Sequence, residues 1–356
     1  MKAKTLSQSD LSALVASLVA ARIRVIAPVR AKDTPEHSDY LPIKRLEDAD
    51  LTGPLPRRSL KEFFLPPSEV LLRYQIRKDG VEIEEVPTTF PLQVLFGVRP
   101  CDAAGIEILD RVMGWDYRDE LWFGRREATT TVSLACTGVD GSCFCTAVGL
   151  GPDAIKGSDV LLVRVEGSFL AQAVTPKGEA LLNRGPLASL AEATSTDKAE
   201  QFGRSAREKV GKNLPASPDI LPDWLARNFD HGVWKSIALR CHGCGACASI
   251  CPTCHCFDIV DEHEHYDRGV RRRNWDSCQT TKFTLHASNY NPRSSQVERF
   301  RQRVMHKFSI YPRRFGAFLC TGCGRCSRGC PAGMNLPEVV GQLIELARAE
   351  SQGGSR

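Results

Sequence analysis

Cysteine is the most chemically reactive residue type that is abundant in this chain, and its positions are unevenly distributed. The 356 residues include fifteen cysteines, with four between Cys101 and Cys145 and eleven between Cys241 and Cys330. An odd number in a long chain argues against a fully paired disulfide framework, which is typical of small secreted domains. Thiolates are also the ligands of zinc and of iron–sulfur clusters. Metal binding is therefore the first chemistry to consider.

Two runs of cysteines share the spacing Cys-x2-Cys-x2-Cys-x3-Cys-Pro, which is that of bacterial ferredoxins. In proteins with two such runs, the fourth cysteine of each run binds the cluster of the other. The spacing therefore predicts two 4Fe-4S clusters with crossed ligands. One would be held by Cys241, Cys244, Cys247 and Cys330, and the other by Cys320, Cys323, Cys326 and Cys251.

Glycines within the two runs support this interpretation. Gly243, Gly245, Gly322 and Gly324 allow the backbone to curl and to direct N–H groups at cluster sulfurs. A zinc ribbon is the alternative, but it needs only two Cys-x2-Cys pairs about 15–20 residues apart. The third cysteine and the Cys-Pro in each run favour iron–sulfur clusters.

Four earlier cysteines predict a further site. Cys101 follows a predicted strand, and Cys136, Cys143 and Cys145 are spaced Cys-x6-Cys-x-Cys beside glycines. If the fold brings them together, they would hold a third 4Fe-4S cluster. The alternative is that they are buried free thiols, which pack as small apolar side chains.

Three cysteines remain without an assigned role. Cys254 and Cys256 come directly after the first run, and Cys278 follows about twenty residues later. They are expected near a cluster, as alternative ligands, as neighbouring thiols or as part of another site. Basic residues at 271–273 and 299–314 either form a solvated surface or stabilise reduced clusters and dock a partner.

Other features exclude several classes of protein. A net charge of +5 is small for a nucleic-acid-binding protein of this length. No uncharged run approaches the ~18 apolar residues that a membrane helix needs. No catalytic triad, phosphate-binding loop or pair of catalytic carboxylates is present, so no substrate-transforming site is evident. The pattern Gly149-x-Gly151-x-x-Ala154 lacks the strand that a dinucleotide-binding fingerprint requires.

Periodicity predicts an α/β N-terminal domain, and the two cysteine runs predict an α-helical, ferredoxin-like C-terminal domain with two clusters. Strands are expected at 24–29, 70–75, 81–86, 93–98, 129–135 and 160–165, and helices at 102–112, at 199–210 and from Pro337 onwards. The proline-rich segment 214–222 suggests a boundary, which gives domains at 1–222 and 223–350.

The first twenty residues contain a short apolar stretch. Leucines and valines at helical spacing, preceded by the capping pattern Ser7-x-x-Asp10, predict an amphipathic helix rather than a signal peptide. We therefore expect a cytoplasmic protein.

The combination of motifs resembles one iron–sulfur family. The segments FGVRPCD, ACTGVDGSCFCT, CPTCHCFD, RRRNWDSC, RFRQRVMHKF and CTGCGRCSRGCP, between Gln93 and Pro331, are similar to those of two sister groups. One group is the β subunits of cytosolic NiFe sulfhydrogenases, and the other is the A subunits of anaerobic sulfite reductases. The eight cysteines of the two runs match the family's motifs, and the four earlier cysteines match its further site.

The resemblance implies an electron-transfer subunit. Its partners would be a flavin- and NAD(P)-binding diaphorase subunit and the small and large subunits of a NiFe hydrogenase. For the sulfite reductase alternative, the catalytic partner would be a siroheme subunit. No flavin is expected in this chain itself. A third possibility, a redox-sensing iron–sulfur regulator, would require a nucleic-acid-binding motif, and none is apparent.

Overall fold

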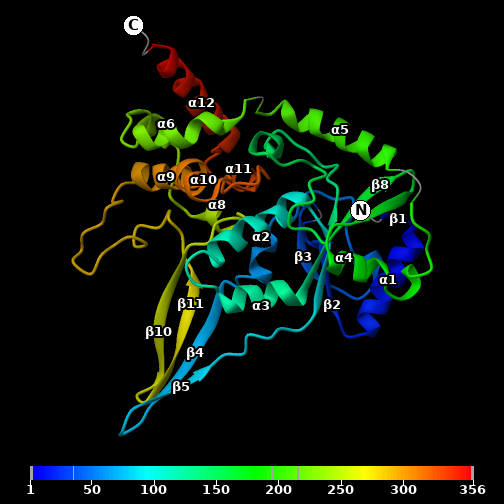
Figure 1. The fold of residues 1–356 in the computed structure, drawn as a ribbon. Coiled ribbons are helices and arrows are strands. Elements are labelled where there is room, and N and C mark those ends of the chain that lie inside the picture. The colour runs from blue at the N-terminus through cyan, green and yellow to red at the C-terminus, as the bar shows by residue number, and fades with distance from the viewer. Residues whose placement is uncertain (1–2, 35, 194–195, 215, 354–356) are drawn as a thin grey trace.

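The computed structural model describes residues 3–34, 36–193, 196–214 and 216–353. Its main sheet has seven strands in the order β1-β9-β8-β7-β6-β2-β3 (Figure 1). The central strands β2, β6, β7 and β8 are parallel, and the outer strands pair antiparallel. The strands are β1 Ala3–Leu6, β2 Arg24–Arg30, β3 Ser38–Ile43, β6 Gln93–Val98, β7 Thr129–Leu134, β8 Val160–Val165 and β9 Ser168–Ala173.

Helices cover both faces of this sheet, and further helices lie in the C-terminal part (Figure 1). They are α1 Gln8–Ala20, α2 Pro100–Met113, α3 Glu120–Ala128, α4 Pro176–Leu182, α5 Asp197–Gly211, α6 Leu221–Arg227, α7 Val233–Ile237, α8 Ala246–Ser249, α9 Gln296–Met305, α10 Tyr311–Phe315, α11 Arg325–Arg328 and α12 Leu336–Gly353.

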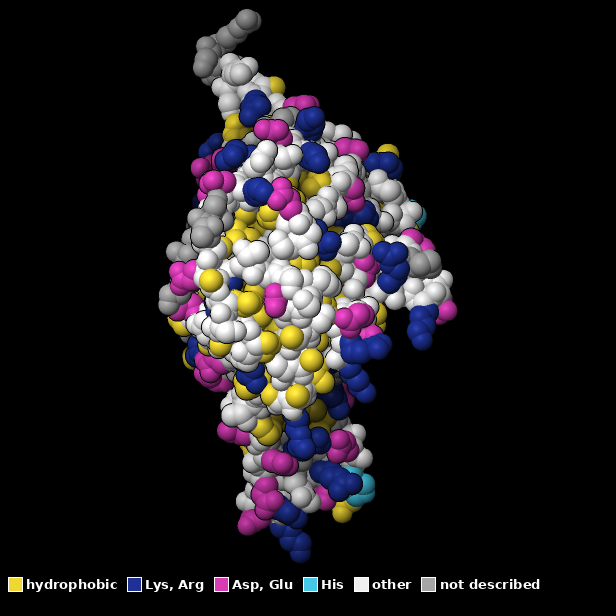
Figure 2. Space-filling model, turned by 90° about the vertical axis from the view of Figure 1, so that its right-hand side faces the viewer, with side chains coloured by type: hydrophobic (Ala, Val, Ile, Leu, Met, Phe, Trp, Pro, Cys, Tyr) yellow, Lys and Arg dark blue, Asp and Glu magenta, His cyan; other side chains and the backbone are white. Residues whose placement is uncertain are grey.

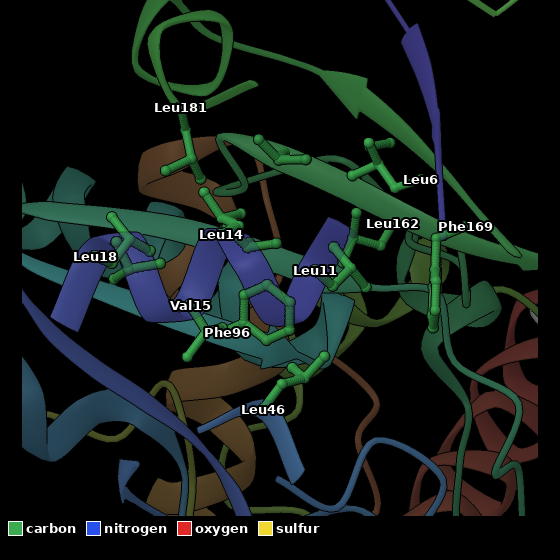
Figure 3. Packing of buried hydrophobic residues seen from close by; sticks show 14 of the residues in the cluster. Leu6, Leu11, Leu14, Val15, Leu18, Leu46, Phe96, Leu162, Phe169 and Leu181 are labelled. Carbon is green, nitrogen blue, oxygen red and sulfur yellow. The ribbon is translucent and has the colours of Figure 1, made fainter. Parts of the chain in front are cut away.

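The core of the main sheet follows from the alternation of side chains along a strand. Val25 and Ala27 of β2 lie in the apolar cluster with α1, whereas Ile26 lies in the cluster with α2 on the other face. Figure 3 shows the leucines of α1 packed among side chains of the sheet such as Phe96 and Leu162. Because both faces are covered, β6 and β8 are largely apolar, whereas β7 also buries Thr129, Thr131 and Ser133.

The predicted strands and helices are confirmed to within two residues at each end. The helix α1 begins at the predicted capping box, in which Ser7 Oγ accepts from the N–H of Asp10 and Asp10 accepts from the N–H of Ser7. The helix α12 begins at Leu336 and buries Val340, Leu343 and Ala347. Strong apolar periodicity made these elements predictable.

A second sheet joins segments that are far apart in the sequence. Its order is β10-β11-β4-β5, from strands β4 Ser68–Ile76, β5 Val81–Glu85, β10 Phe257–His265 and β11 Arg268–Trp275. It extends away from the main sheet (Figure 1). The strands β10 and β11 were not predicted because they are rich in charged residues. The expectation of an α-helical C-terminal domain is therefore not confirmed, since this hairpin lies within it.

The surface carries charges of both signs. On the face shown in Figure 2, Lys and Arg side chains are interspersed with Asp and Glu. Along the second sheet, Arg271 and Arg272 of β11 pair with Asp261 and Glu262 of β10. Within the described part of the chain, no helix is long and apolar enough to cross a membrane.

Candidate metal centres

The first cysteine run forms a tight loop that leads into the short helix α8. Gly243 and Gly245 have φ angles of +68° and +75°, which L-residues with side chains rarely adopt. This curl arranges the cysteines of the first run around a cavity. The second run adds the thiol of its last cysteine, Cys330, to the same cavity. The cysteines that line this first cavity are Cys241, Cys244, Cys247, Cys330 and Cys326.

The cysteines predicted to hold the second cluster are more deeply buried than those predicted for the first. Cys320 and Cys251 are 8% and 7% exposed, and the charges of Cys320, Cys326 and Cys251 act on one another. Burial raises the pKa of Cys320 to about 12 and that of Cys326 to about 11. Because a metal ligand must be a thiolate, these sulfurs need positive charge or metal beside them.

Two buried cations lie beside this group of sulfurs. Lys307, 2% exposed, places its Nζ 3.4 Å from Cys251 Sγ and donates to the carbonyl of Leu319 at 2.8 Å. Arg303, 4% exposed, donates from Nη1 to Cys254 Sγ at 3.3 Å and lines the first cavity. These contacts support the predicted electrostatic role of the basic segment at 299–314.

Polar N–H groups also point at the cysteine sulfurs, as the glycine-rich loops predicted. Gln296 Nε2 donates to Cys241 Sγ at 2.9 Å, and the backbone N–H of Gly322 donates to Cys320 Sγ at 3.4 Å. Hydrogen bonds to sulfur stabilise the added negative charge of a reduced iron–sulfur cluster. Gln296 was not singled out from the sequence, because no motif marks it.

The main sheet brings the four earlier cysteines together. Cys101 lies in the first turn of α2, directly after β6, and Cys136 follows β7. Because β6 and β7 are adjacent parallel strands, their carboxyl ends meet at one edge of the sheet. Cys143 and Cys145 come from the loop after β7. All four line one cavity, together with Cys323 of the second run.

This third cavity is packed directly against the second run. The N–H of Phe144 donates to the carbonyl of Gly322 at 2.8 Å. A Cβ on Gly322 would lie 2.5 Å from the backbone nitrogen of Cys145, and one on Gly324 would lie 2.6 Å from the carbonyl oxygen of Ser142. Only glycine permits so close an approach of the two loops.

A buried ion pair joins the same two regions. Arg325, between two cysteines of the second run, donates through Nη1 and Nη2 to the two carboxylate oxygens of Asp102, each at 2.6 Å. Tyr40 also donates to Asp102, at 2.8 Å. Both oxygens of Asp102 are therefore engaged. Asp102 therefore anchors the second run beside Cys101.

Other predicted basic residues serve the fold instead. Arg271 and Arg272 form the exposed cross-strand pairs of the second sheet, and Arg273 is buried against Glu69 and Asp119. In addition, Lys61, which the sequence did not single out, is 4% exposed and lies with its Nζ 3.9 Å from the centre of the Trp275 ring. Its charge acts on Cys254, Cys251 and Cys256.

The three unassigned cysteines lie next to these sites. Cys254 is hydrogen-bonded to Cys251, and Cys256 is hydrogen-bonded to Cys278. Within the described ranges, no group of three or more His, Cys, Asp or Glu side chains is close enough to share one metal ion. The cysteines of a 4Fe-4S cluster each bind a different iron atom, so this finding does not bear on the cluster sites.

Comparisons with known proteins support this arrangement of thiols. Residues 240–334 match the family described as 4Fe-4S dicluster domains. Over 325 residues, the chain is 32% identical to sulfhydrogenase 2 subunit beta of Pyrococcus furiosus, an alignment that covers 90% of this chain and 92% of that protein. The chain belongs to the sulfhydrogenase beta subunit family. No solved structure gives a significant match.

Membership in this family confirms the resemblance that the cysteine motifs indicated. The dicluster domain spans both cysteine runs, from Cys241 to Cys330. The chain is therefore an iron–sulfur protein of an oxidoreductase family. The four cysteines around the third cavity lie outside the matched domain.

The residues present fit 4Fe-4S clusters. The first and third cavities are each lined by the four cysteines predicted for that cluster and by one cysteine predicted for the second. The buried sulfurs are accompanied by N–H donors and by the cations Lys307 and Arg303. The cations lower the pKa of neighbouring thiols, and metal binding would complete their deprotonation. A cluster bound there would accept and release one electron at a time.

Proposed function

We propose that this chain is the electron-transfer subunit of a hydrogenase complex of the sulfhydrogenase type. Electrons would pass between a flavin- and NAD(P)-binding diaphorase subunit and the small and large subunits of a NiFe hydrogenase. The family supports the class of complex, and the cysteines support the role within it. The expected cellular location is the cytoplasm.

The observation that carries the proposal is the arrangement of twelve cysteines in three adjoining groups. The second run lies in the middle, because Cys326 borders the first cavity and Cys323 borders the third. Three clusters held in this way would form a continuous row. The ligands proposed for the first are Cys241, Cys244, Cys247 and Cys330, for the second Cys320, Cys323, Cys326 and Cys251, and for the third Cys101, Cys136, Cys143 and Cys145.

The chain's own residues have defined tasks in this role. The loops hold thiolates at fixed positions, and Lys307 and Arg303 offset the negative charge that accumulates on reduction. Cys244 is exposed, so the first site lies near the surface. The two-domain division at 222/223 and the ferredoxin-like character of the C-terminal part belong to the same proposal.

The first test is iron content with selective loss at the third site. Anaerobically prepared protein should contain about twelve iron atoms per chain, eight from the two runs and four from the third site. Replacing Cys143 and Cys145 by Ser should remove about four and leave the electron paramagnetic resonance signals of the other two. Unchanged iron content would contradict the third cluster and show that Cys143 and Cys145 are buried free thiols.

The second test addresses the partner. NAD(P)H delivers two electrons as hydride, so a flavin must stand between it and one-electron clusters. The isolated chain should therefore show no NAD(P)H-to-viologen activity, and adding the diaphorase subunit should restore reduction by NADPH. Replacing Cys251 or Cys330 by Ser should then lower the activity. Stoichiometric flavin with NAD(P)H oxidation by the isolated chain would contradict the proposal.

A further inference from the structure

Cys256 and Cys278 lie outside the twelve proposed ligands, and the second sheet brings them together. The hairpin β10–β11 starts with the pairing of Phe257 and Trp275, and the N–H of Asp276 donates to the carbonyl of Cys256 at 3.0 Å. The thiol of Cys256 donates a hydrogen bond to the sulfur of Cys278. The two sulfurs are thus neighbours at the base of a hairpin.

The pair lies next to the first cavity, because Gln279 contacts Cys278 and also lines that cavity. Cys278 is 9% exposed, and Gln279 Nε2 lies 3.6 Å from its sulfur. The same amide donates to the carbonyl of Arg299 at 2.8 Å, and Gln279 lines the first cavity. Cys247, a proposed ligand of that cavity, is close enough for the charge of Cys278 to act on it. Gln279 therefore borders both Cys278 and the first cavity.

The surroundings of the pair suit thiol chemistry. Hydrogen bonding from Cys256 is the main cause that lowers the pKa of Cys278 to about 6, with Arg303 and Lys307 adding to it. A thiolate beside a protonated thiol is the usual state of a reactive dithiol. Cys254 is the third thiol nearby, but it is engaged with Cys251 and Arg303.

We propose that Cys256 and Cys278 form a redox-active pair that stores two electrons beside the first iron–sulfur site. This inference rests on the proposed function. Oxidation of the Cys256 thiol and the Cys278 thiolate forms one S–S bond, releases one proton and yields two electrons. The electrons pass singly to oxidised iron–sulfur clusters of this chain, and reduction reverses every step. Such a pair would match one-electron carriers to a two-electron donor.

The first experiment tests the bond itself. Full-length chain is equilibrated anaerobically in dithiothreitol buffers of graded potential, quenched in acid, alkylated, digested with trypsin and examined by mass spectrometry. We expect the peptide 274–282, whose single cysteine is Cys278, to become linked to the peptide 241–268 with loss of two hydrogens. The linked fraction should follow a two-electron curve, in which 29.6 mV changes the ratio tenfold.

Three variants identify the partners. Cys256→Ser and Cys278→Ser should abolish the linked peptide, whereas the matched control Cys254→Ser should retain it. A linked peptide that persists in Cys256→Ser, or its absence from the wild-type chain at every potential, would overturn the pair.

The second experiment separates the pair from the clusters. Cys256→Ser and Cys278→Ser should keep the wild-type iron content, while the electrons taken up per chain in a dithionite titration fall by two. Loss of about four iron atoms in either variant would make the residue a ligand and overturn the inference. A wild-type chain without iron would instead overturn the proposed function, whereas the thiol titration decides whether the pair exists.

Discussion

At the scale of single residues, glycine determines how closely the second cysteine run approaches the third site. Gly322 has a φ angle of +62°, and its Cβ position is filled by the backbone of Phe144 and Cys145. Gly333 has nearly the same φ angle, +64°, but a Cβ there would meet nothing within 4 Å. A comparison of the two glycines therefore separates two effects of adding a Cβ: strain in the left-handed backbone, which both share, and collision with the loop at 142–145, which occurs only at Gly322.

Replacing Gly322 by Ala should destabilise the chain more than replacing Gly333 by Ala. Both changes should lower the free energy of unfolding by about 1–2 kcal/mol, because alanine adopts the left-handed conformation unfavourably. At Gly322 the new methyl group must also displace the loop at 142–145, which adds about 1–3 kcal/mol. Anaerobic urea unfolding followed by circular dichroism measures the difference. Equal losses in the two variants would show that the contact does not matter.

At the scale of elements, the hairpin β10–β11 depends on one buried arginine. Arg273 of β11 is 5% exposed and pairs with Glu69 of β4 and with Asp119, which caps α3. Arg271, two residues earlier, pairs with Asp261 on the exposed side of the same strand. Arg273 thus joins the second sheet to the rest of the protein, whereas Arg271 only links two neighbouring strands.

Replacing Arg273 by Ala should lower the free energy of unfolding by about 1.5–3 kcal/mol, because the buried carboxylate of Glu69 loses one of its two arginine partners and keeps Arg125 at 2.8 Å. Replacing Arg271 by Ala should cost at most about 1 kcal/mol, because water solvates the exposed Asp261. Urea unfolding measures the free energy of unfolding of both variants. Limited proteolysis should also cut the hairpin β10–β11 faster in Arg273→Ala than in Arg271→Ala. A similar small loss in both would contradict the anchoring role of Arg273.

At the scale of the whole molecule, the crossed ligands make the C-terminal part depend on metal. The proposed sites tie segments about seventy residues apart, whereas the main sheet has its own apolar core on both faces. Iron removal by an anaerobic chelator should therefore loosen 240–334 more than the strands β6, β7 and β8. Hydrogen exchange detected by mass spectrometry measures both regions in one sample. Equal protection before and after iron removal would contradict this dependence.

The sequence by itself determined the chemistry and the elements with strong local patterns. Cysteine spacing specifies the dicluster domain because one tight loop must place its thiols around one inorganic group, and this is a local requirement. The parallel strands and the helices α1, α2, α5 and α12 were predictable because burial on one or both sides imposes an apolar period.

Tertiary structure alone decided the relations between distant segments. The strands β10 and β11 are charged, and their strand form depends on pairing with β4 and with each other. No local pattern placed Asp102 against Arg325 or Cys256 against Cys278, because these pairs come from chain segments that only the folded topology brings together. The meeting of Cys101 with Cys136 follows from two adjacent parallel strands that end at the same edge. That adjacency is a property of the sheet and not of either strand's own sequence.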